Sequence, residues 1–177
     1  MAHRPATGEV AAVSAPTPSP DSLPDFEDLW RTYHGAPDRL ASAVRGLSDE
    51  QADRAETVGA TTVRLMIARL VDDELVSAAT MRRLLAEPGV DLPDHDAEAW
   101  LEASAPTLRL DVAVQAFTGL RRLTAALLRA LPEAAWMHNA VHPRGGRVTL
   151  AQHFLSHTLQ TEAAIAGILA GRRARNW

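Results

Sequence analysis

The side chains that could do chemistry in this chain are of few kinds. Its 177 residues include no Cys, and all 18 basic residues are Arg because there is no Lys. These absences exclude thiolate nucleophiles, disulfides, Cys-ligated metals and Lys Schiff bases. Acid–base chemistry must therefore come from His, Asp, Glu or the single tyrosine, Tyr33.

Two histidines have a spacing that could serve chemistry. His153 and His157 lie four residues apart in a segment with helical periodicity. At about 100° per residue, positions 153, 157, 160 and 164 fall within about 60° of one another on a helix. A pair of this kind suits metal binding from one helix face. It equally suits proton transfer by an imidazole, whose ordinary pKa is ~6.5.

Four long helices are predicted to position these residues. The segment Thr61–Glu87 has no Gly or Pro and keeps one face apolar, which predicts a helix roughly 40 Å long, with Thr61 as its cap. A helix of this length needs partners of similar length. They are expected over Asp25–Leu47, bent or broken near Pro37, over Leu108–Leu131, and over Thr149–Gly171 with Thr149 as the cap. The sequence therefore predicts an all-α four-helix bundle over residues 25–177.

Shorter segments connect the predicted helices. Ser48 and Gln51 have the spacing of a capping box and predict a short helical turn. Another short helical piece is expected over Ala97–Ala103, and Pro132–Val148 is expected to be a linker with a turn at residues 143–146. Residues 1–24 are rich in Pro and poor in large apolar side chains, which predicts a disordered tail.

Composition limits the partners that this chain is expected to have. The net charge of −4 provides no basic surface for nucleic acid. No run approaches the ~18 apolar residues of a membrane span. The N-terminus also lacks the charged-then-apolar pattern of a signal peptide. We therefore expect a cytoplasmic protein without a nucleic-acid or membrane partner.

Several phrases, in their order along the chain, resemble the DinB-like superfamily in its YfiT-type branch. They are RLVDDELVSAATMRRLLAEPGVDLPDHDAEAW, LLRALPEAAW, and VHPRGGRVTL leading into a helix that ends IAGIL. The resemblance covers most of Ser48–Ala170 and implies a four-helix bundle with a long crossover, commonly a homodimer. It also implies a metal site, since characterised relatives bind zinc or nickel through three His. Such sites support hydrolysis, S-transfer from low-molecular-weight thiols, or a mycothiol-dependent isomerisation.

The chain departs from this family pattern at all three ligand positions. Aligning the family phrases with this sequence places Arg69, Gln160 and Ala164 where relatives have His. Arg does not bind metals because its guanidinium stays protonated, and Ala has no ligand atom. We therefore expect that the family metal site is lost and that no cofactor is bound.

Three interpretations of the His pair follow. His153 and His157 are hydrogen-bonded interior residues without a chemical role, or they hold a displaced metal together with Asp73, or they serve a metal-free pocket. In the third interpretation one His transfers a proton, Asp73 orients it, and Arg69 binds an anionic group. Gln160 would also face this pocket. Trp30 and Tyr33 either pack in the core or line the mouth of the pocket.

The third interpretation is our leading one. It predicts a small-molecule enzyme or binding protein with metal-independent acid–base chemistry, such as an isomerisation, elimination or cyclisation in bacterial specialised metabolism. The alternatives are a metal-dependent thiol S-transferase or hydrolase that uses a shifted His site, and a non-catalytic dimeric module. Two further expectations concern charged residues. Glu74 is expected to pair with an Arg on a neighbouring surface, and Arg121 to lie on a solvated helix face.

Overall fold

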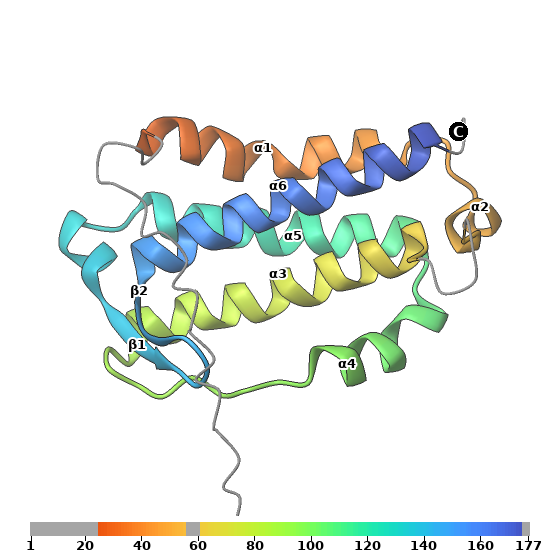
Figure 1. The fold of residues 1–177 in the computed structure, drawn as a ribbon. Coiled ribbons are helices and arrows are strands. Elements are labelled where there is room, and N and C mark those ends of the chain that lie inside the picture. The colour runs from red at the N-terminus through yellow and green to blue at the C-terminus, as the bar shows by residue number, and fades with distance from the viewer. Residues whose placement is uncertain (1–24, 56–60, 175–177) are drawn as a thin grey trace, which may run out of the picture.

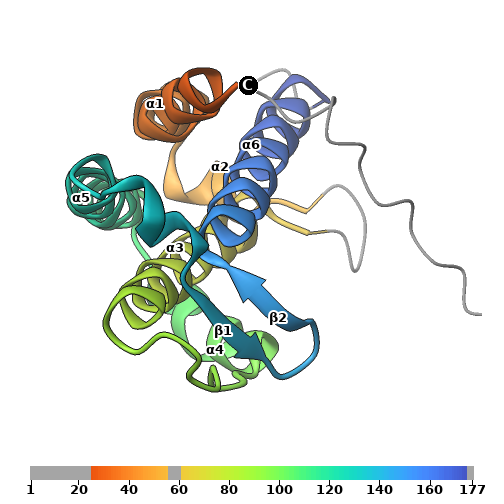
Figure 2. The same cartoon turned by 90° about the vertical axis from the view of Figure 1, so that its left-hand side faces the viewer.

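The computed structural model describes residues 25–55 and 61–174 of the chain. Its body is formed by four long helices, α1 (Phe26–Val44), α3 (Val63–Ala86), α5 (Leu110–Arg129) and α6 (Leu150–Ala174). Figures 1 and 2 show them side by side around one core, with α3 and α6 running in opposite directions. The all-α four-helix bundle predicted from the sequence is confirmed. The predicted tail, residues 1–24, lies outside the described residues.

The shorter elements lie at the ends and along one side of this bundle. They are α2 (Asp49–Asp53), α4 (Ala97–Ser104), the 3-10 turns η2 (Ala105–Thr107) and η3 (Glu133–Met137), and the strands β1 (Asn139–His142) and β2 (Gly146–Thr149). The predicted capping box at α2 is present, since the Ser48 and Gln51 side chains each bond to the other's backbone N–H. None of the helices in the described ranges combines the length and apolar character needed to cross a membrane.

Helix α3 follows the prediction closely, apart from its cap. The Thr62 hydroxyl, and not that of Thr61, accepts the backbone N–H of Leu65 at 3.2 Å. The helix ends at Ala86, and Gly89 then takes a positive φ of 88° that lets the chain turn away. Its 24 residues cross the whole bundle, and α5 and α6 pack along its length.

Helix α1 was predicted to bend or break near Pro37, and it continues without a break from Phe26 to Val44 with Pro37 inside it. Proline has no N–H to donate within the helix. On the preceding turn the Arg39 guanidinium donates a hydrogen bond to the Thr32 carbonyl. Arg39 also pairs with Glu162 of α6 at 2.7 Å, which ties the two helices together.

The predicted linker between α5 and α6 contains a β-hairpin that the sequence analysis did not predict. β1 and β2 pair antiparallel, with His142 opposite Gly146 at the turn. The hairpin is joined to the loop after α3, since Leu92 donates to the Val141 carbonyl at 2.8 Å and Val141 to the Val90 carbonyl at 2.9 Å. The hairpin and this loop therefore form a cover beside α3 and α6 (Figure 2).

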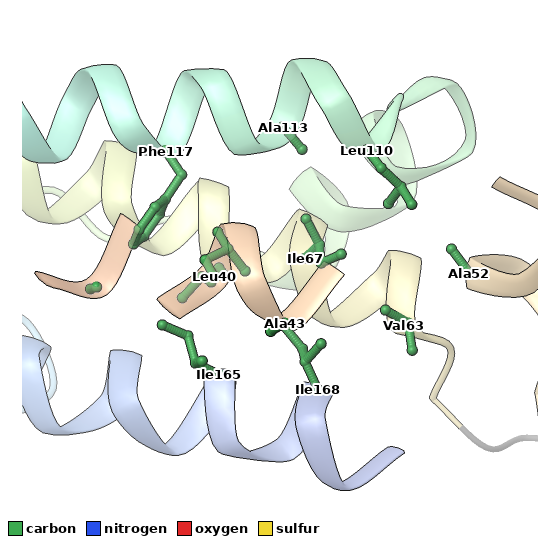
Figure 3. Packing of buried hydrophobic residues seen from close by; sticks show 12 residues of the cluster. Leu40, Ala43, Ala52, Val63, Ile67, Leu110, Ala113, Phe117, Ile165 and Ile168 are labelled. Carbon is green, nitrogen blue, oxygen red and sulfur yellow. The ribbon is translucent and has the colours of Figure 1, made fainter. Parts of the chain in front are cut away.

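The core has two apolar clusters separated by a polar layer. One cluster includes Leu40, Ile67, Phe117 and Ile165, which Figure 3 shows directed toward the middle of the bundle. The other lies toward the opposite end and includes Met81, Leu128 and Phe154. Along α3, α5 and α6, buried polar residues fall between these clusters in sequence: Glu74, Ser77, Arg121, Thr124, His157, Thr158 and Thr161. A buried polar layer of this kind requires a specific arrangement of hydrogen bonds.

Candidate functional site

A polar cleft of about 540 Å³ opens between α3, α6 and the hairpin. The residues that line it carry mostly ionisable or hydrogen-bonding side chains: Asp73, Ser77, His95, His142, Arg147, Gln152, His153, Ser156, His157 and Gln160, together with Val76, Gly145 and Val148. The structure therefore brings His153, His157, Asp73 and Gln160 to one place, as the predicted helix face requires. It adds His95 and His142, which come from the loop after α3 and from the hairpin.

His153 is held at the inner side of this cleft. Its Nε2 lies 3.0 Å from the hydroxyl oxygen of Ser77, a buried residue of α3. Its ring stacks on that of His157 at an interplanar angle of 4° and a centroid distance of 6.3 Å. Burial lowers the pKa of His153 to about 4, and the nearby His157 and His142 act in the same direction. His153 is therefore neutral at pH 7 and binds ligands as an uncharged imidazole.

This lowered pKa predicts a pH dependence of stability. Between about pH 4 and 6.5 the unfolded chain binds more protons at this residue than the folded chain does. The contribution of neutral His153 to the free energy of unfolding is therefore present above pH 6.5 and is lost as the pH falls.

From pH 7 to pH 5, we expect the wild type to lose about 2 kcal/mol more of its unfolding free energy than His153→Gln loses. Urea denaturation at both pH values measures the difference. The exposed His34, changed to Gln, should follow the wild type, and parallel curves for wild type and His153→Gln would contradict the shift.

His157 belongs to a buried network that crosses three helices. Its Nε2 lies 2.8 Å from Oε2 of Glu74 on α3, and the same carboxylate oxygen accepts from Nη2 of Arg121 on α5 at 2.5 Å. Arg121 Nη2 also donates to the Thr161 hydroxyl at 2.9 Å. The side chains of Glu74, Arg121 and His157 are 0%, 1% and 6% exposed. The guanidinium lies over the ring of Tyr33, 4.0 Å from its centre, which adds a cation–π contact.

The burial of this network and the contact between Glu74 and His157 were not predicted from the sequence. Glu74 does pair with an Arg, as expected, but the pair is interior and not at a surface. The expectation that Arg121 lies on a solvated face is wrong, because Arg121 occupies the buried stripe of α5 between Phe117 and Leu128. The spacing of residues along α3 did indicate that Glu74 is buried. The buried face of this helix is formed by residues three and four positions apart: Ile67, Leu70, Glu74, Ser77, Met81 and Leu84.

Asp73 and Gln160 both border the cleft, as expected, but Asp73 does not orient a His by a hydrogen bond. The carboxylate that contacts His157 is Glu74, so Asp73 is not the hydrogen-bonded partner of that imidazole. Asp73 lies on the exposed side of α3, where partial loss of solvent raises its pKa, an effect opposed by His157 and Arg69. Gln160 is exposed and donates to the Ser156 hydroxyl at 3.3 Å.

Arg69 lies in a second polar hollow that adjoins the cleft. Its guanidinium pairs with Glu98 of α4, and its side chain is about half exposed. The hollow has a volume of about 710 Å³ and shares His95 and His142 with the cleft. Arg69 therefore lies near the His pair but does not line the same cleft.

The two aromatic candidates on α1 do not line the cleft. Tyr33 is fully buried beneath Arg121, and burial raises its pKa. Trp30 packs on Phe154 at a ring-centre distance of 6.2 Å and borders a separate small hollow with His34 and Arg129. Of the two alternatives in the sequence analysis, the structure places Tyr33 in the core and Trp30 at the bundle surface near α5.

The residues present do not form a recognisable metal centre. Within residues 25–55 and 61–174, no group of three or more His, Asp or Glu side chains is placed to hold a metal ion. Of the three positions where the resemblance places ligands, Arg69 is engaged by Glu98, Gln160 offers an amide, and Ala164 packs against the apolar core. The donor set that a zinc or nickel site needs is therefore not assembled by these side chains.

The fold and the cleft together define a class of protein, an all-α bundle with a polar site between two of its long helices and a hairpin. The model of the DinB superfamily matches residues 32–160, and the chain belongs to this superfamily. A protein of Bacillus mycoides (strain KBAB4), named as a candidate metal-dependent hydrolase, is 26% identical over 151 residues, 85% of this chain and 87% of that protein. A protein of Bacillus thuringiensis subsp. konkukian (strain 97-27) with the same kind of name is 25% identical, with the same coverage.

Solved structures support the same fold. YfiT from Bacillus subtilis, described as a candidate metal-dependent hydrolase with an unusual four-helix bundle topology, superposes with a TM-score of 0.81 and 22% identity. The match covers 93% of this chain and 96% of YfiT. The mycothiol-dependent maleylpyruvate isomerase matches with a TM-score of 0.66 and 12% identity, over 82% of this chain and 61% of that one. At these identities the likeness establishes the fold alone.

Proposed function

We propose that this protein binds a small molecule in the cleft between α3, α6 and the hairpin and transfers a proton on it without a metal ion. The observation that carries the proposal is the convergence of His153, His157 and Asp73 on one polar cleft, with a carboxylate behind His157. The reactions that such a site suits are isomerisations, eliminations and cyclisations, in which a base removes a proton from carbon.

In this proposal His157 is the general base. The Glu74 carboxylate, 2.8 Å from Nε2, orients the imidazole, as the third group behind a catalytic base does. His153 is neutral at pH 7 and a weak base because its pKa is about 4, so it serves better as a hydrogen-bonding group that orients the ligand. Asp73 and Gln160 at the cleft edge can bind polar groups of the ligand. Arg69, in the adjoining hollow, remains our candidate for an anionic group on a longer ligand.

Metal independence is supported by the side chains at the positions where the resemblance places ligands. Arg69, Gln160 and Ala164 supply no imidazole there. Relatives of this chain are named as metal-dependent hydrolases, and we do not extend that activity to it. A cytoplasmic location, a homodimer and a role in specialised metabolism remain predictions from the sequence and the resemblance.

Deuterium exchange tests the proposal without knowledge of the natural substrate. Chelator-treated full-length protein is incubated in D₂O with a panel of small carbonyl compounds that carry an acidic C–H bond, and deuterium incorporation is followed by NMR. We expect at least one compound to exchange. His157→Ala should lower its rate by about a hundredfold, the lower end of what a positioned base contributes.

A matched control separates a catalytic effect from a general one. His34→Ala removes an exposed imidazole outside the cleft and should leave the exchange rate unchanged. An exchange rate that survives His157→Ala would remove His157 as the base. Exchange that requires added zinc or nickel would support the alternative of a metal-dependent enzyme with a shifted site.

A further inference from the structure

The buried network around His157 contains one nitrogen with more neighbours than it has hydrogens. Arg121 Nη2 lies within hydrogen-bonding distance of Glu74 Oε2 (2.5 Å), Thr161 Oγ1 (2.9 Å) and His157 Nε2 (3.2 Å). A guanidinium Nη carries two hydrogens, so only two of these contacts can be donated hydrogen bonds. The two shorter contacts go to oxygen acceptors. The longest contact, to His157 Nε2, is therefore the one left without a hydrogen from Arg121.

The remaining contact of His157 then determines its protonation pattern. Nε2 lies 2.8 Å from Glu74 Oε2, so one of these two atoms must donate. Oε2 already accepts from the guanidinium and behaves as a carboxylate oxygen, which is an acceptor only. The hydrogen must therefore be on Nε2.

We propose that Glu74 and Arg121 are positioning residues that hold His157 with a proton on Nε2, which leaves Nδ1 as the proton-accepting nitrogen of the cleft. Among the hydrogen bonds of the described residues, none involves His157 Nδ1. His157 lines the cleft, so Nδ1 is the ring nitrogen left for a ligand. The role of Nδ1 as acceptor rests on the proposed function, whereas the location of the proton on Nε2 does not.

The network is placed to hold this arrangement rigidly. Glu74, Arg121 and His157 come from three different long helices, so the packing of the bundle sets their separation. The guanidinium is stacked over Tyr33 and lies 4.9 Å from the ring centre of Phe117. Thr161 occupies the second hydrogen of Nη2, so the guanidinium cannot turn toward His157 without losing a bond.

NMR of full-length protein with ¹⁵N-labelled histidine tests the assignment directly. The chain has seven His, and the signals of His157 are identified by their loss in His157→Gln. At neutral pH we expect a protonated Nε2, with a proton resonance that persists in water, and an unprotonated Nδ1. A proton on Nδ1 would overturn the assignment, and this wild-type measurement depends on no variant's folding.

The double variant Glu74→Leu/Arg121→Met tests whether the pair holds the proton in place. It removes the acceptor and its counter-charge together, so no buried charge is left unpaired. We expect loss of the persistent Nε2–H resonance. Thr158→Val is the matched control and should retain it, because the Thr158 hydroxyl donates to the Phe154 carbonyl of its own helix at 2.7 Å. Persistence of the resonance in the double variant would overturn the role of Glu74 and Arg121.

The effect of the double variant on catalysis is measured with the deuterium-exchange assay. At saturating ligand the double variant should exchange at least tenfold more slowly, while the half-saturating ligand concentration stays within a factor of two. An unchanged rate would overturn the positioning role. If no compound exchanges with the wild type but Nε2 is protonated and the resonance depends on the pair, the proposed function fails while the placement of the proton stands.

Discussion

Replacing Arg121 with Met is expected to destabilise this protein by about 3–5 kcal/mol. The reason is the position of its partner. Glu74 is fully buried, and its Oε2 accepts from Arg121 at 2.5 Å. Without the guanidinium this carboxylate would remain in the interior as an unpaired charge, with only His157 as a donor. Urea or guanidinium denaturation, monitored by circular dichroism, measures the loss.

Two further variants make this expectation specific. Glu74→Leu/Arg121→Met removes both charges and should recover most of the lost stability, because buried ion pairs can be exchanged for apolar residues at little cost. Arg122→Met changes an exposed neighbour on the same helix and should stay within about 0.5 kcal/mol of the wild type. If Arg121→Met were as mild as Arg122→Met, the buried charge pair would not be part of the folded protein.

The triple variant Arg69→His/Gln160→His/Ala164→His is expected to bind one zinc or nickel ion per chain, whereas the wild type is expected to bind none. Helices α3 and α6 run antiparallel, and Glu74 meets His157 across them. Counting about 1.5 Å per residue in opposite directions, Arg69 on α3 lies level with the turn of α6 that holds Gln160 and Ala164. Three imidazoles at these positions would supply the donor set that the present side chains lack.

Elemental analysis after metal exposure and desalting measures this gain. The double variant Gln160→His/Ala164→His is the control, since two imidazoles on one helix should hold metal less tightly than three from two helices. Stoichiometric metal in the wild type that is lost in His157→Ala would contradict the expectation. It would show that the His pair forms a shifted site, and metal-dependent hydrolysis or thiol transfer would become the leading function.

The side of helix α5 that faces the core could not be predicted from the sequence. The apolar residues of α5 include Val112 and Leu123, yet these side chains are 50% and 60% exposed. The buried face instead carries Ala113, Arg121 and Thr124. Periodicity identifies which residues share a side of a helix, but with leucines on several sides it does not identify which side faces the core.

The sequence by itself determined the number of the long helices and their bounds to within about three residues, the Ser48–Gln51 capping box, the family, and the chemistry excluded by the absence of Cys and Lys. These features depend on local rules, namely helix period, caps and breakers, or on residue identity alone. It also placed His153 and His157 on one face, because four residues make about one helical turn.

Only the tertiary structure decided which carboxylate meets His157. Asp73 and Glu74 are adjacent in sequence but point about 100° apart on α3, so the rotation of that helix against α6 chooses between them. The same is true of Arg121, whose buried Nη2 finds acceptors in Glu74 and Thr161 on two other helices. A charged side chain enters a core only where partners from other elements are within reach. That condition depends on how the helices pack and cannot be read from any one of them.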